Sequence, residues 1–193
     1  GVKSVLSVDG GAPDIEAARA AGLRYAHVTI RYSVITLEQK LEIARAMRDL
    51  DGPIYVHCHH GKHRGPAAAA AGLVSLGVLT ADEGGEFMKL AGTSSKYPGL
   101  YECVSESVPL ESAQVELVAL PGEVAEVPGF VAAMADVSRA YENLLLVEET
   151  DWAQNPEHPD LAPASEAGQL ADILRILTER RDPEGQPEDF YET

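Results

Sequence analysis

Residues 54–66 read IYVHCHHGKHRGP, and five alanines follow at residues 67–71. The β-branched and aromatic run at 54–56 comes directly after a Gly-Pro breaker and predicts a buried strand. Pro66 suits the first turn of a helix, and alanine has the highest helix propensity, so we expect a helix over 67–76. The segment from Cys58 to Gly65 is therefore a loop that joins the end of a strand to the start of a helix.

The composition of this loop is typical of an anion site. Unpaired N–H groups and the dipole at a helix N-terminus attract negative charge, and nearby cations in such a place favour the thiolate form of a cysteine. Arg64 follows Cys58 by six positions and offers a planar fork that matches two phosphoryl oxygens. Gly61 lets the backbone turn so that consecutive N–H groups converge. Cys58 is the expected nucleophile, and Arg64 is expected to hold the transition state.

The segment resembles the H-C-x5-R active-site loop of the protein tyrosine and dual-specificity phosphatase superfamily. Its GKHRG run is similar to the longer GKHRTG of the atypical dual-specificity phosphatases of plants and fungi. The resemblance implies a parallel-sheet α/β cysteine-phosphatase fold and a phosphoric monoester hydrolase that forms a phosphocysteine intermediate and uses no cofactor and no metal. It also implies a set of substrate-binding residues in and beside the loop: His57, His59, His60, Gly61, Lys62, His63 and Gly65.

Strand and helix patterns alternate before the loop, and helices are expected after it. Strands are predicted over 3–8 and 24–30, helices over 14–21, 37–50 and 80–90, and a loop over 91–101. The β-α-β-α-β order predicts a parallel sheet with right-handed crossovers and helices on both faces. Ligands of such sheets bind at the carboxyl ends of the strands, where Asp9, the loop 31–35 and Cys58 would meet.

The net charge of −16 is unevenly distributed along the chain. Residues 1–110 contain 11 Lys and Arg against 12 Asp and Glu, whereas residues 111–193 contain 4 against 19. We expect a phosphatase-like α/β domain over 1–110, with an acidic helical extension over 111–193 packed on it. The extension should contain helices over 128–149 and 165–180 and a frayed tail from residue 182. The acidic balance argues against nucleic-acid binding, and no apolar run approaches the roughly 20 residues of a membrane span.

Two positions depart from the pattern that the resemblance implies. The loop 31–35 should carry an aspartate that protonates the leaving oxygen, but it reads RYSVI. Asp9 is the best substitute for that acid, and Asp14 and Glu38 are the next candidates. Gly65 stands where a serine or threonine would assist hydrolysis of the phosphocysteine. Because a general acid contributes about 10²–10⁴-fold to the rate, turnover is expected to be slow.

Other functions are compatible with the same residues. A catalytically impaired phosphoanion-binding module would use the same loop, and a sulfur- or arsenate-handling enzyme would use Cys58 in another reaction. Metal binding by the histidines around Cys58 is disfavoured, because adjacent residues of one tight loop cannot all point at one ion. Two cysteines do not form a disulfide framework, which favours a cytoplasmic location. The sequence leaves open the oligomeric state and whether the phosphorylated substrate is a protein or a small molecule.

Overall fold

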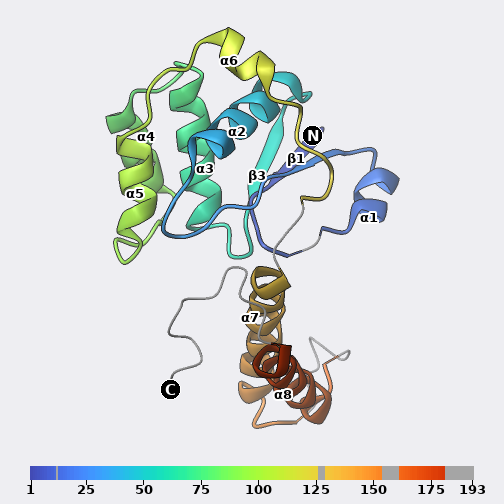
Figure 1. The fold of residues 1–193 in the computed structure, drawn as a ribbon. Helices are drawn as coiled ribbons and strands as arrows, with labels where there is room; N and C mark the ends of the chain where they lie inside the picture. Colours follow the sequence, from blue (N-terminus) through green and yellow to red (C-terminus); the bar gives the residue numbers. More distant parts are fainter. Residues whose placement is uncertain (12, 126–128, 154–160, 181–193) are drawn as a thin grey trace. The chain divides into compact units, whose positions relative to one another are not determined.

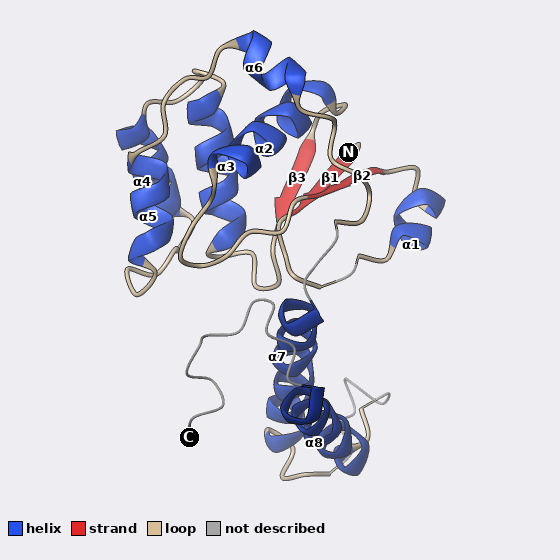
Figure 2. Ribbon diagram, in the orientation of Figure 1, coloured by secondary structure: helices blue, strands red, loops and turns tan. Residues whose placement is uncertain are grey.

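The computed structural model describes residues 1–11, 13–125, 129–153 and 161–180. The chain divides into two units, Gly1–Glu126 and Val127–Thr193. The first unit is α/β, and the described part of the second is helical (Figure 1, Figure 2). Among the residues described, no helix combines the length and the apolar character needed to cross a membrane.

A three-stranded parallel sheet forms the centre of the first unit. Its strands are β1 (Ser4–Ser7), β2 (Arg24–His27) and β3 (Ile54–His57), in the order β2-β1-β3. Ser7 pairs with both His27 and His57, so the three strands end at the same level. The expected parallel α/β sheet is confirmed. The strand predicted over 24–30 ends at His27, although the Val28 N–H still donates to the Ser7 carbonyl over 2.9 Å.

Six helices lie in the described part of the first unit: α1 (Ile15–Ala20), α2 (Leu37–Asp49), α3 (Arg64–Ser75), α4 (Ala81–Leu90), α5 (Pro98–Ser105) and α6 (Ser112–Leu117). Helix α1 lies on one side of the sheet, and α2 and α3 lie on the other (Figure 1). This placement follows from right-handed crossovers, because the chain moves from β1 to β2 in one direction and from β2 to β3 in the other.

The small residues of α3 determine how closely it packs. Alanines 67, 68, 70 and 71 are fully buried beneath α2 and α4. A Cβ added at Gly72 would lie 2.8 Å from Ile43 Cγ2, so a larger residue would separate α3 from α2. The helix begins at Arg64 rather than at residue 67, which brings the arginine into its first turn.

Helices α5 and α6 are not predicted by the sequence. The segment 91–101 resembles a loop because it contains serines, a proline and a glycine. Pro98 occupies the first position of α5, however, where a missing N–H is tolerated. Helix α6 packs on α2 through the buried Val115. The first unit therefore continues past residue 110, where the charge changes, and includes the residues up to Glu126.

The outer edge of β2 is covered by the last described residues of the first unit. The His27 N–H donates to the Gly122 carbonyl over 2.9 Å, and the Ala125 N–H donates to His27 Nδ1 over 3.1 Å. An uncovered parallel strand would leave its polar backbone groups unpaired. The chain after α6 thus completes the sheet edge.

Two long helices, α7 (Gly129–Glu148) and α8 (Pro163–Arg180), pack against each other in the second unit. They confirm the two helices expected in the acidic part of the chain. Ala140, Val147 and Leu177 are buried, and the buried Glu166 accepts a hydrogen bond of 2.8 Å from the Asn143 amide. The tail expected to fray from residue 182 lies outside the described residues.

Gly99 is expected to tolerate no side chain. A Cβ there would overlap the Ser33 carbonyl oxygen and lie 2.8 Å from the Ser33 carbonyl carbon, both of which are backbone atoms. Gly99→Ala should therefore lower the free energy of unfolding by about 1–3 kcal/mol. Gly85→Ala is the matched control, because a Cβ at Gly85 in α4 meets nothing within 4 Å. It should raise stability by about 0.5–1 kcal/mol. Urea denaturation measures both changes, and equal changes would contradict the packing described.

Candidate active site

The loop between β3 and α3 places a cysteine at the carboxyl end of the sheet. Cys58 follows β3 directly and is only 4% exposed. Gly61 has φ +69°, in the left-handed region, and its N–H donates to the Cys58 carbonyl over 3.2 Å. The loop then runs through His63, the N-cap of α3, into Arg64. The strand, loop and helix expected around Cys58 are all present.

The Arg64 guanidinium is buried and held from two sides. Arg64 is 9% exposed, and its Nη2 donates to Asp9 Oδ1 over 2.6 Å. The Tyr32 ring centroid lies 4.7 Å from Arg64 Cζ, at a distance that permits a cation–π interaction. Arg64 Nε is buried and has no hydrogen-bond partner among the described residues. Because a buried donor without a partner is costly, this N–H is suited to an anionic ligand.

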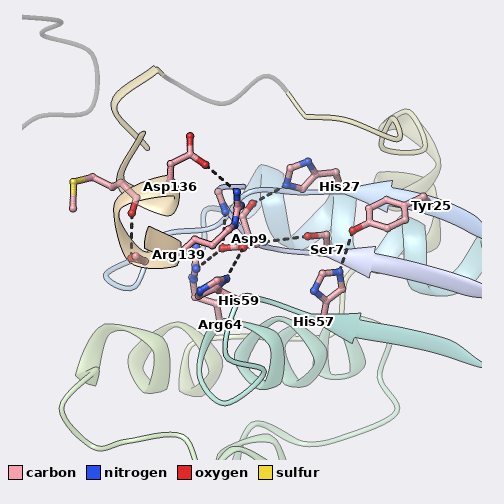
Figure 3. Close-up of polar contacts among 12 residues, drawn as sticks. Ser7, Asp9, Tyr25, His27, His57, His59, Arg64, Asp136 and Arg139 are labelled. Carbon is pink, nitrogen blue, oxygen red and sulfur yellow. Dashed lines mark hydrogen bonds and ion pairs between the residues drawn. The ribbon is translucent and has the colours of Figure 1, made fainter. Parts of the chain in front are cut away.

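Asp9 is a central acceptor of the site. Its Oδ1 accepts from the Gly10 N–H over 2.9 Å as well as from Arg64, and its Oδ2 lies 3.9 Å from His59 Nδ1. The Asp9 carbonyl bonds to His27 Nε2 over 2.7 Å. Because His27 Nδ1 accepts the Ala125 N–H, Nε2 carries the hydrogen of that bond. Figure 3 shows Arg64 and His59 directed toward Asp9. The carboxylate considered as an acid is therefore engaged in holding Arg64.

The two further carboxylates considered as acids have other surroundings. Asp14 is exposed and caps α1 by accepting the Ala17 N–H over 2.9 Å. Glu38 is exposed in the first turn of α2 and lines a cavity of about 490 Å³ together with Glu42. Burial, and then the charge of Glu38, raise the pKa of Glu42. Neither Asp14 nor Glu38 has a described contact with the loop 58–64.

His57 is directed away from the loop and toward the sheet. Its Nε2 lies 3.0 Å from the Tyr25 hydroxyl (Figure 3). Its ring stacks on that of Tyr55, with the centroids 5.4 Å apart. Burial lowers the pKa of His57, while a backbone hydrogen bond with Cys58 and the charge of Asp9 act in the opposite direction. The neutral imidazole is thereby favoured, and the arrangement suits a role in orienting the start of the loop.

The remaining histidines and the lysine of the loop differ in their exposure and in their contacts. His59 is half-buried and contacts the exposed His60 with ring centroids 4.8 Å apart. Lys62 is exposed, and its carbonyl accepts a hydrogen bond of 2.8 Å from the Thr93 hydroxyl. His63 Nδ1 accepts the Ser94 N–H over 3.3 Å. Burial is the main cause that lowers the pKa of His63, followed by the charges of His60 and Lys62.

An aromatic cluster that the sequence does not predict borders Arg64. It consists of Tyr32, Tyr97 and His63: Tyr97 lies 4.6 Å from each of the other two ring centroids, and Tyr32 and His63 are 6.4 Å apart. Burial raises the pKa of Tyr32, whereas the neighbouring Arg64 charge lowers it. The available signal was the position of Tyr32 in the loop 31–35, at the carboxyl end of β2. If only carboxylates are considered as acids in that loop, Tyr32 is not identified.

Gly65 packs against the backbone at the end of β3. A Cβ at this position would lie 3.3 Å from the Cys58 nitrogen and 3.4 Å from the His57 carbonyl carbon. These backbone atoms belong to the strand and loop that support the cysteine and cannot move independently. Close packing of the first turn of α3 therefore gives a local reason for glycine where a hydroxyl-bearing residue was expected.

Comparison with known proteins gives no further guidance. No family model, no curated protein and no solved structure matches the chain. The chemistry of the site is therefore inferred from its residues and their geometry.

Proposed function

We propose that the protein is a cysteine-dependent phosphatase that hydrolyses phosphoric monoesters through a phosphocysteine intermediate. In this proposal the first unit has the cysteine-phosphatase fold. The observation that carries the proposal is the buried Arg64 guanidinium in the first turn of α3, six residues after the buried Cys58, with Nε lacking a partner among the described residues. A buried, anchored cation with an unused donor beside a thiol suits the capture of a tetrahedral anion.

The proposed reaction uses the loop for both binding and attack. The first N–H groups of α3 and the Arg64 fork hold the phosphoryl oxygens, and Cys58 Sγ attacks phosphorus. The leaving alcohol departs, and water then hydrolyses the phosphocysteine. Lys62 supplies positive charge at the entrance, where His59 and His60 offer ring nitrogens for hydrogen bonds to the substrate, while His57 and His63 orient the two ends of the loop.

The proposed substrate is a phosphorylated protein or a small phosphorylated molecule, and the chemistry requires no cofactor. Cys58 and Cys103 are both free thiols, which supports a reducing, cytoplasmic location as part of the proposal. The acidic composition of the chain disfavours nucleic acid as a partner.

A phosphoanion-binding module with the same loop is the second candidate. Two observations favour it: the Asp9 carboxylate is engaged by Arg64, and Gly65 has no hydroxyl to assist the second step. Such a module would bind phosphate at the loop without breaking a phosphorus–oxygen bond.

Rapid mixing with 4-nitrophenyl phosphate distinguishes the two candidates. The phosphatase should release a burst of 4-nitrophenol equal to the enzyme concentration, followed by slow turnover, because the second step lacks a helper at Gly65. Acid quenching during the burst should give a peptide that contains Cys58 and carries one phosphoryl group by mass spectrometry. Binding of vanadate or phosphate with neither burst nor phosphopeptide would favour the binding module, and no binding at all would exclude both candidates.

A further inference from the structure

We propose that Tyr32 is the general acid of this reaction and donates its phenolic hydrogen to the leaving oxygen. This inference rests on the proposed phosphatase function. It assigns to the loop after β2 a catalytic group that is not a carboxylate.

The position of Tyr32 relative to the cysteine and the arginine supports the assignment. The loop 31–35 follows β2, and Cys58 follows β3, so both emerge at the carboxyl end of the same parallel sheet. The Tyr32 ring lies 4.7 Å from Arg64 Cζ, beside the group that would hold the phosphoryl oxygens. The phenol therefore lies beside the cation of the site and at the same sheet edge as the nucleophile.

The surrounding residues fix the ring in place. Tyr97 packs against it with centroids 4.6 Å apart, and the His63 ring centroid lies 6.4 Å from it. The next residue of the loop, Ser33, is in backbone contact with Gly99 of α5. A donor held this way needs little rearrangement to reach a bound substrate, which is what general acid catalysis requires.

Asp9 is less suited to the acid role. Its Oδ1 accepts from both Arg64 and Gly10, so a hydrogen placed on this carboxylate would weaken the ion pair that holds the guanidinium. We therefore regard Asp9 as a positioning residue that acts through Arg64.

The protons and bonds balance over the two steps. The Cys58 Sγ reacts as the thiolate: its bond to phosphorus forms as the bond from phosphorus to the leaving oxygen breaks, and the Tyr32 hydrogen passes to that oxygen. The phenolate that remains is stabilised by the Arg64 guanidinium. In the second step a water molecule attacks phosphorus and gives a proton to the phenolate, and the S–P bond breaks to release the Cys58 thiolate. This step regenerates the Tyr32 phenol and the Cys58 thiolate, and inorganic phosphate is released.

Burial agrees with this cycle. It raises the pKa of Tyr32, so the phenol keeps its hydrogen at neutral pH, and the Arg64 charge opposes that increase and favours the phenolate once formed. The rings that face Tyr32 among the described residues are those of His63 and Tyr97.

The test uses Tyr32→Phe, which keeps the ring beside Arg64 and removes only the hydroxyl. Burst rate constants are measured for a series of aryl phosphates whose phenols range from strongly to weakly acidic. We expect little change for the most acidic phenol and a loss of about 10²-fold for the least acidic, because only poor leaving groups need the proton. The dependence of rate on leaving-group acidity should therefore become steeper.

Two further variants complete the design. Tyr97→Phe removes a neighbouring phenol hydroxyl and should leave this dependence as in the wild type. Asp9→Asn should lower the rate for all leaving groups alike, since it loosens Arg64. Urea denaturation of each variant checks that it is folded.

The outcomes separate the inference from the function on which it rests. A uniform loss in Tyr32→Phe, or no loss, would overturn the role of Tyr32 while the wild-type burst still supports the phosphatase. A steeper dependence in Asp9→Asn alone would assign the acid to Asp9. The absence of a wild-type burst with every aryl phosphate would reject both the function and the role of Tyr32.

Discussion

Replacing Cys58 by serine is expected to eliminate the burst and to lower steady-state hydrolysis of aryl phosphates by about 10⁴-fold or more. A serine hydroxyl is not ionised at neutral pH, and none of the described contacts places a general base beside position 58. The substitution is nearly isosteric, so the loop and the first turn of α3 should keep their geometry. The decisive measurement is the burst amplitude together with the phosphopeptide mass.

Cys103→Ser is the matched control for this substitution. Cys103 is also buried, and its Sγ accepts the Ile35 N–H over 3.1 Å, so it has a structural contact but no role in the proposed reaction. This variant should retain the burst. Cys58→Ser should still bind vanadate or phosphate, because Arg64 and the loop N–H groups are unchanged. Undiminished turnover in Cys58→Ser would exclude a phosphocysteine mechanism.

Arg64→Lys should lower the burst rate by about 10²–10³-fold and weaken phosphate binding, although the charge is conserved. Lysine carries its donors on one nitrogen and has no planar fork, so it cannot reproduce the geometry in which Arg64 faces Asp9 and the phosphoryl oxygens. It would also replace a guanidinium that the Tyr32 ring and the Asp9 carboxylate hold in position. Rapid mixing and phosphate binding by calorimetry measure the two effects.

The control is Arg48→Lys on the exposed face of α2, where the arginine pairs with Asp49 near the surface. Surface ion pairs of this kind contribute little, so both stability and rate should stay close to the wild type. If Arg64→Lys retained a rate within a few-fold of the wild type, Arg64 would not hold the transition state.

The sheet and the helices before the loop were predictable because their signals are local. Strand and helix periodicity defines the βαβ order, and right-handed crossovers then determine the topology. The same rule explains why Asp9, the loop 31–35 and Cys58 were expected at one sheet edge. Arg64 contacts both Asp9 and Tyr32, which agrees with that expectation.

The parts that were not predicted depend on contacts distant in sequence. The pairing of Gly122 and Ala125 with His27 has no local pattern, so the charge change at residue 110 was a misleading marker of where the first unit ends. The stacking of Tyr32 beside Arg64 depends on the packing of α5, which was itself missed. Whether Asp9 holds Arg64 or donates a proton also depends on side-chain geometry, which cannot be predicted from the sequence pattern.

The covered edge of β2 has a consequence for the order in which the protein is made. His27 supports the Asp9 carbonyl, and two further residues that bond to His27, Gly122 and Ala125, lie near the far end of the first unit. A ribosome adds roughly 5–20 residues per second, so several seconds separate the emergence of β2 from that of its cover. In the later part of that interval, the segment from Cys58 to Arg64 has also emerged while the sheet edge is still open. The site is therefore expected to reach its final form only when the last residues of the first unit have left the ribosome.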